Sequence, residues 1–268
     1  MLPLRNISTR GASRTPPPTK TKRYILGPIY QKEFIIEDNC VDCYGRLKPS
    51  TILYFAQEIA GQHCLELAVD YDTLAARRLF WAVIRHKVQI SRMPMRGERI
   101  RIETWPMPTT RVAYPRSMVA YDAAGNECFR LISLWVLMDL DSRNMILPGK
   151  SGISVDGTLR GLELSNPLGL VAKPLENHKK RSVCFTDLDR NGHMNNTKYL
   201  DWISDLLPSP FHAQNNLNEL TVCYLSEAIE GQELEMRWDF LEEGTLQVDA
   251  YRMGEEKEER IFSARMVF

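Results

Sequence analysis

A short polar stretch of the chain carries side chains of the kinds that acyl-transfer enzymes use. Asp189, Asn191 and His193 stand at alternate positions, and Gly192 separates the last two. A carboxylate, an amide and an imidazole at this spacing can orient a water molecule and move its proton. Asp, Asn and Gly are also ordinary turn formers, so these residue types alone are equally typical of a structural loop.

The residues around this motif predict a strand, a loop and a helix. An apolar run at 182–185 precedes the motif, and apolar residues recur at helical spacing through 198–207. Asn195 or Asn196 is a suitable N-cap, and Pro208 ends the helix.

The motif should therefore lie just before a helix N-terminus. We expect the backbone N–H groups of Gly192 and His193 to be free there and to be candidate donors to an oxyanion. We expect Asp189 to hold the loop and to orient Asn191 or His193.

A second copy of the motif occurs earlier in the chain. Residues 41–50 align without gaps on 188–197, a shift of 147 positions, and the apolar, Asp and Gly positions coincide. Later strands align around Gly97 and Gly231, a shift of 134 positions. The first copy has Tyr44 and Arg46 where the second has Asn191 and His193. This pattern predicts two tandem copies of one small α+β domain, of which only one carries acid-base residues.

Each copy reads as one helix followed by consecutive strands. The helix predicted at 51–66 is apolar on most faces, so we expect it to be surrounded by protein. A short helix is predicted at 71–78. Short links between the strands favour an antiparallel sheet wrapped around the long helix. Strands are predicted at 30–36, 80–91, 99–105, 111–121, 128–139, 219–226, 233–241, 245–252 and 260–268.

Composition and charge exclude several classes of protein. Six of the 34 Lys and Arg residues lie in residues 1–23, which hold no acid, so the remainder carries a net charge of −6 and does not favour nucleic-acid binding. No apolar run approaches the roughly 20 residues of a membrane span. We expect a cytoplasmic protein with reduced cysteines, or a plastid stromal one if the basic tail is a transit peptide. Cys40 and Cys43 alone are a weak metal signal, and we expect no metal and no cofactor.

Four segments follow from these patterns. Residues 1–23 read as a disordered basic tail, and 24–146 as the N-terminal copy. The stretch 147–180 is rich in Gly and Pro and reads as an interdomain linker. Residues 181–268 form the C-terminal copy.

The motif from Asp189 to Tyr199, with the repeat and the tryptophan-bearing strands at Trp105 and Trp135, resembles the acyl-acyl carrier protein (acyl-ACP) thioesterases of plants and bacteria. The resemblance covers residues from about 28 to the end. It implies an α+β fold of the tandem, or double, hotdog type, with two antiparallel sheets each wrapped around a long central helix. In that family a glutamate on the strand after the central helix completes the site, and the resemblance places this role on Glu227.

Plant members often carry a cysteine directly after that glutamate, but this chain has Ala228. A covalent cysteine route at that position is therefore excluded, and Cys223 is a poor substitute because it has no counterpart in the family motif. The catalytic candidates are Asp189, Asn191, His193 and Glu227, and the division of acid and base roles between His193 and Glu227 stays open.

The resemblance implies hydrolysis of fatty acyl-ACP to a free fatty acid, which ends chain elongation. The acyl chain is expected in the N-terminal copy, near Ala56 and Gly61, and the acidic carrier protein is expected to meet a basic surface. Candidate residues for that surface are Lys179, Lys180, Arg181, Arg190 and Lys198. Alternatives are an acyl-CoA thioesterase, a hotdog enoyl hydratase or dehydratase, and a noncatalytic acyl-binding protein. The sequence leaves open the length and saturation of the acyl chain and whether the chain is carried by acyl carrier protein or by coenzyme A. It also leaves open whether the protein is a monomer or a homodimer.

Overall fold

A computed structural model describes residues 29–242, 244–254 and 257–268 of the 268-residue chain, so the predicted tail at 1–23 lies outside the described residues. The helices are α1 (Pro49–Glu66), α2 (Tyr71–Ala75), α3 (Pro148–Ser151), α4 (Lys198–Ser204) and α5 (Ser209–Gln214). The strands of the first half are β1 (Tyr30–Ile35), β2 (Leu79–Ile90), β3 (Arg99–Pro106), β4 (Tyr114–Tyr121), β5 (Glu127–Asp139) and β6 (Met145–Ile146). Those of the second half are β7 (Asn177–Ser182), β8 (Glu219–Tyr224), β9 (Glu233–Glu242), β10 (Thr245–Met253) and β11 (Glu258–Val267).

All these strands join in one antiparallel sheet. Its order is β1-β3-β4-β5-β2-β8-β11-β10-β9-β7, and β6 adds to β5. The two halves meet where β2 pairs with β8, for example His86 opposite Val222. Each half has the antiparallel sheet that was expected, and the β2–β8 pairing joins the two into a single continuous sheet.

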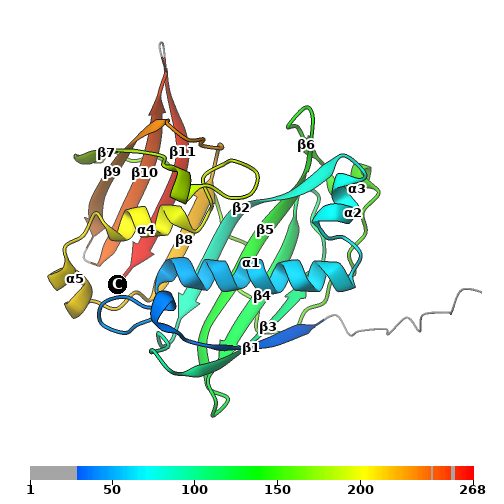
Figure 1. Cartoon of the computed structure of the whole chain (residues 1–268), viewed down its shortest axis with the longest axis horizontal. Helices are drawn as coiled ribbons and strands as arrows, with labels where there is room; N and C mark the ends of the chain where they lie inside the picture. The colour runs from blue at the N-terminus through cyan, green and yellow to red at the C-terminus, as the bar shows by residue number, and fades with distance from the viewer. Residues whose placement is uncertain (1–28, 243, 255–256) are drawn as a thin grey trace, which may run out of the picture.

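The helices lie on one side of this sheet, α1 over the first half and α4 over the second (Figure 1). Pro49 occupies the start of α1, where its missing N–H costs nothing. Ile52, Phe55 and Ile59 of α1 share one buried cluster with Trp202 and Ile203 of α4, so a single core spans both halves.

Helix α4 is shorter than the sequence predicts. It ends at Ser204, and the N–H of Leu206 bonds to the carbonyl of Ile203, a tighter turn than an α-helix makes. Pro208 disfavours helical backbone at the residue before it, which accounts for the early end. The second half therefore has a central helix of 7 residues against 18 in α1.

The segment between α3 and β7 crosses the face of the sheet opposite to the helices. Side chains of the sheet donate to its carbonyl groups: Arg85 to Pro167, Arg260 to Leu170 and Gln247 to Val171. Gln247 alternates along β10 with the core residues Leu246 and Val248, so it points away from the core. The linker is thus packed on the outer face.

Candidate active site

A tight turn closed by the Asp189 carboxylate presents His193. Asp189 Oδ1 accepts from the backbone N–H groups of Asn191 (2.8 Å) and His193 (3.3 Å). The N–H of Gly192 donates to the carbonyl of Asp189 at 3.1 Å, and Gly192 adopts a φ of +79°, which glycine tolerates without strain.

This geometry corrects two expectations. The N–H groups of Gly192 and His193 are both bonded to Asp189, so the expectation that they are free to receive an oxyanion is wrong. The N-cap of α4 is Thr197, and Asn195 instead accepts from the N–H and hydroxyl of Thr197, both at 2.9 Å. The segment before the turn also differs from the strand predicted at 182–185. Strand β7 ends at Ser182, and residues 185–187 form a 3₁₀ turn.

His193 and Glu227 lie side by side. His193 forms an isolated antiparallel bridge with Ile229, which brings the loop after β8 against the turn. The Nε2 of His193 is 3.4 Å from Oε2 of Glu227, and their side chains are 18% and 49% exposed. Glu227 follows the end of β8 at Tyr224, so it lies in a loop and not, as expected, on the strand.

Arg143 is the member of this group that sequence reasoning missed. Its Nη2 is 3.2 Å from His193 Nε2, and its Nη1 is 3.7 Å from Glu227 Oε1. It comes from the hairpin between β5 and β6 in the other half, has a left-handed φ of +57° and lies over the ring of Phe80. No spacing in the sequence connects a residue 50 positions away to the motif.

These residues line a cavity of about 890 Å³ at the junction of the two halves. Its polar wall holds Asp189, Asn191, His193, Glu227 and Arg143. The same cavity is also lined by aromatic and apolar side chains of the first half, namely Tyr71, Phe80, Trp81, Val83, Ile84, Trp135 and Met138. A polar reaction centre and an apolar surface from the first half thus share one cavity.

The first copy of the motif has the same turn with different side chains. Asp42 accepts from the N–H groups of Tyr44 (2.9 Å) and Arg46 (3.0 Å), and Arg46 forms a bridge with Met95. The shift from Arg46 to His193 is 147 and that from Met95 to Ile229 is 134, the two shifts of the repeat. The alignment places Met93 where the second copy has Glu227.

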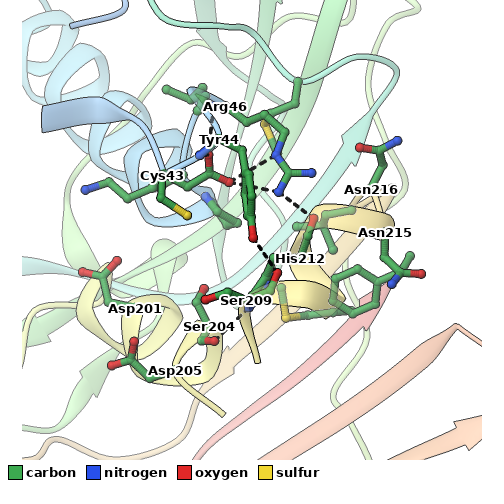
Figure 2. A pocket seen from close by; sticks show the side chains of 18 residues that line it. Cys43, Tyr44, Arg46, Asp201, Ser204, Asp205, Ser209, His212, Asn215 and Asn216 are labelled. Carbon is green, nitrogen blue, oxygen red and sulfur yellow. Dashed lines mark hydrogen bonds and ion pairs between the residues drawn. The ribbon is translucent and has the colours of Figure 1, made fainter. Parts of the chain in front are cut away.

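Figure 2 shows the pocket beside this first copy, about 330 Å³ in volume. The hydroxyl of Tyr44 donates to the carbonyl of Ser209 at 2.8 Å, and Arg46 donates to that of His212 at 2.6 Å (Figure 2). Both residues therefore bond to the backbone of α5. The repeat has kept the turn in both copies, but in the first copy it anchors a helix.

Other possible reactive groups lie elsewhere. The thiol of Cys223 is buried and faces the carbonyl of Leu168 in the linker, 3.8 Å away on the outer face of the sheet. All six cysteines are free. Within the described residues, no cluster of three or more His, Cys, Asp or Glu side chains could hold a metal ion, and no helix has the length and hydropathy to cross a membrane.

The surface expected to meet a carrier protein is partly neutralised by the chain's own carboxylates. Lys180 pairs with Glu233, and Arg181 pairs with Asp205. Lys198 is 4.0 Å from the carboxylate of Asp201. Three of the five candidate cations are therefore within ion-pair distance of acids, whereas Arg190 lies over the ring of Tyr71 beside the cavity.

The duplicated helix-and-sheet architecture is that of a double hotdog protein. The protein-family model of the acyl-ACP thioesterase N-terminal domain matches residues 27–147, and that of the C-terminal domain matches 172–266. The chain belongs to the acyl-ACP thioesterase family.

Individual relatives are distant. The chain is 25% identical over 225 residues to an oleoyl-acyl carrier protein thioesterase, chloroplastic, of Coriandrum sativum, which covers 75% of this chain and 60% of the relative. The chain thus spans about three fifths of that relative's length. Its fold is similar to the crystal structure of an acyl-ACP thioesterase from Bacteroides thetaiotaomicron, with a TM-score of 0.79, 22% identity and coverage of 90% of this chain and 98% of that one. It is also similar to the 12:0-ACP thioesterase from Umbellularia californica, with a TM-score of 0.76, 20% identity and coverage of 91% and 98%.

Proposed function

We propose that this protein hydrolyses the thioester of fatty acyl-ACP and releases a free fatty acid. The observation that supports this most strongly is the pairing of His193 and Glu227 in a cavity that is also lined by apolar and aromatic side chains. A thioester carbonyl needs the polar wall, and its acyl chain needs the apolar one. Family membership is consistent with the same reaction.

In the proposed mechanism, Glu227 takes a proton from water, and the water oxygen bonds to the thioester carbonyl carbon. The carbon–sulfur bond then breaks, and the departing thiolate takes the proton that Glu227 removed from the water, which restores the base. General-base assistance of this kind contributes roughly 10² to 10⁴ in rate. His193 lies beside the base and positions the water, and its imidazole can carry the proton that the thiolate needs.

The developing oxyanion needs donors other than the bonded N–H groups of the turn. Arg143 supplies a guanidinium within 4 Å of both His193 and Glu227. The side-chain amide of Asn191 lines the cavity and makes no hydrogen bond to the described residues, so it can donate to the carbonyl or the water. We assign Asp189 the supporting role of closing the turn that presents His193.

The proposal divides the labour between the halves. Residues 24–146 bind the acyl chain and contribute Arg143, and residues 181–268 provide His193, Asn191 and the base Glu227, with 147–180 as the connection. All the side chains to which the proposal gives a role line one cavity of a single chain.

The test is thiol release from matched acyl-ACP and acyl-CoA substrates. We expect hydrolysis of both, with a higher kcat/KM for the carrier-linked chain. Faster turnover of acyl-CoA would identify a coenzyme A thioesterase. Hydration of an enoyl thioester without thiol release would identify a hydratase, and binding without any turnover would identify an acyl-binding protein.

A further inference from the structure

A second cavity, of about 200 Å³, adjoins the first between α1 and the strands β3 and β4. The two cavities share Gln57, Tyr71, Trp81 and Trp135 as walls. Ala60 and Gly61 of α1 form its small-residue side, and Tyr114 and Pro115 add apolar surface. This is the direction in which an acyl chain would extend from the candidate active site.

One wall of this cavity is a buried cation. Arg116, on β4, lines the cavity and is 8% exposed. Its Nη1 is 3.0 Å from His63 Nδ1 and 3.4 Å from Thr104 Oγ1, and its Nη2 is 3.9 Å from Cys64 Sγ. Among the described residues, no Asp or Glu makes an ion pair with Arg116.

The neighbours of Arg116 do not neutralise it. Burial, reinforced by Arg116 itself, lowers the pKa of His63 to about 4, so the imidazole is neutral and accepts a hydrogen bond at Nδ1. Burial raises the pKa of the Cys64 thiol, which therefore stays protonated. The other charged residue of the cavity wall, Asp70, directs its carboxylate to the N–H groups of Asp72 and Thr73 at the start of α2.

A cation at the wall of an apolar cavity is costly for a protein that binds only hydrocarbon chains. A buried charge without a counter-ion loses its hydration, a penalty that effective pairing or hydrogen bonding must offset. Arginine also stays protonated at any ordinary pH and offers a planar fork that matches a carboxylate. A methyl group at the end of a saturated chain would add no partner to this fork, which among the described residues bonds only to the neutral groups of His63, Thr104 and Cys64, whereas an oxygen acceptor would bond to it.

Resting on the proposed function, we infer that the Arg116 cavity selects acyl chains whose far end carries an oxygen acceptor, either a hydroxyl group or a carboxylate. Both groups offer the lone pairs that the guanidinium lacks. The carboxylate adds the counter-charge, so an ω-carboxyl chain should be favoured over an ω-hydroxyl chain of equal length. Chains with a methyl end should be the poorest substrates at the length that reaches Arg116.

The experiment compares three thioester series, with methyl, ω-hydroxyl and ω-carboxyl ends, across a range of chain lengths. We expect kcat/KM for the oxygenated chains to exceed that for the methyl chain by about tenfold or more at the optimal length, because a site built for a polar group discriminates strongly against its absence. Arg116→Leu should reverse this order. Arg99→Leu, which removes an exposed arginine of β3 paired with Glu33, should not change it.

Two further measurements test the role of Arg116 if the Arg116→Leu variant does not fold. Arg116→Lys keeps the charge and loses the fork, and should retain part of the preference for the carboxyl chain. Binding of a dicarboxylic acid and of the matching monocarboxylic acid to the His193→Ala protein, measured by calorimetry, needs no turnover. The dicarboxylic acid should bind about tenfold more tightly.

Equal or faster hydrolysis of methyl-ended chains at every length would overturn the inference, as would an Arg116→Leu variant that slows all three series alike. If none of the three thioester series is hydrolysed, the proposed function fails. The calorimetric comparison of the dicarboxylic and monocarboxylic acids still decides whether the far end of the chain is recognised at Arg116.

Discussion

Arg143 offers the sharpest test of how the two halves cooperate, because it reaches the candidate catalytic pair from the other half of the chain. Its guanidinium is 3.2 Å from His193 Nε2 and 3.7 Å from Glu227 Oε1. In the mechanism proposed above it stabilises the negative charge that develops on the carbonyl oxygen. Arg143→Ala should therefore slow hydrolysis while leaving the turn and the cavity in place.

The size of the effect follows from Coulomb's law. An oxyanion about 3.7 Å from the guanidinium, the distance at which Glu227 Oε1 lies, would interact with it by about 1 kcal/mol at the dielectric constant of water and by about 4 kcal/mol at an effective value of about 20. The side chains of Arg143 and Glu227 are 42% and 49% exposed, so the interaction energy at the dielectric constant of water applies. We therefore expect kcat/KM to fall by about five- to tenfold.

The assay is continuous thiol release from an acyl-ACP substrate by Arg143→Ala, Arg143→Lys and the unaltered protein. The lysine variant should lose less than the alanine variant, and added guanidinium should restore part of the alanine variant's rate. The free energy of unfolding of the alanine variant should differ from that of the unaltered protein by less than about 1 kcal/mol, as is usual when an exposed ion pair is removed. Unchanged or faster turnover in Arg143→Ala would refute the reasoning, because it would mean that Arg143 only occupies His193 in the free protein.

Three other changes have defined outcomes. Glu227→Gln should lower kcat by about 10² to 10⁴ with little change in thermal stability, whereas Glu230→Gln, three residues further along the same loop, should stay within twofold or so; equal rates for the two variants would discard Glu227 as the base. Gly61→Leu should shorten the preferred acyl chain, because a Cβ at Gly61 would meet no atom of the described part of the chain within 4 Å and the new side chain can enter the smaller cavity. An unchanged product profile would argue against a chain there. Burial lowers the pKa of His86 to about 3 from its usual 6.5, so below about pH 6.5 the unfolded chain takes up a proton at His86 that the folded protein does not, and the free energy of unfolding decreases as the pH falls toward 3. His86→Phe also removes two buried nitrogens that have no hydrogen-bond partner among the residues that the structure describes, so it should raise the free energy of unfolding at neutral pH by about 1 kcal/mol. The variant should also lose less stability than the unaltered protein between pH 7 and 5, as calorimetric melting at both pH values would show.

The sequence predicts the elements of this fold well where local patterns decide them. The apolar helix at 51–66 corresponds to α1, and the alternating strands correspond to β1–β5 and β8–β11 within a few residues. The repeat is visible because Asp42 and Asp189 close the same turn, which depends only on residues within five positions of each carboxylate. Long-range pairing was not predictable in the same way, and the β2–β8 junction that joins the sheets has no signal in either strand alone.

The residues of the candidate site were predictable where they belong to the local motif or to the family resemblance. The motif itself points to Asn191 and His193, and the family resemblance points to Glu227. Arg143 could not be found, because its place depends on how a hairpin of one half folds over the other. The supposed oxyanion donors failed because the side chain of Asp189 takes the N–H of His193 and its carbonyl takes that of Gly192, a competition that spacing alone does not reveal.

Ala56 and Gly61 show a similar limit. Both are small residues of α1 at positions where a chain could approach, but Ala56 packs in the main core and Gly61 lines the smaller cavity. The sequence of a helix that is apolar on most faces does not indicate which of its small residues lines a cavity. That depends on how the helix packs against β3 and β4, which the helix sequence alone does not determine.

The central claim is that the turn of the second copy, with His193, takes part in the chemistry, whereas the same turn in the first copy, with Arg46, only anchors α5. Initial rates of thiol release from acyl-ACP by His193→Ala and by the matched Arg46→Ala variant test it most directly. We predict a loss of about 10² to 10⁴ for His193→Ala and a rate within a few-fold of the unaltered protein for Arg46→Ala, provided that the latter remains folded at the assay temperature. Near-normal hydrolysis by His193→Ala, or equal losses in two folded variants, would contradict the account.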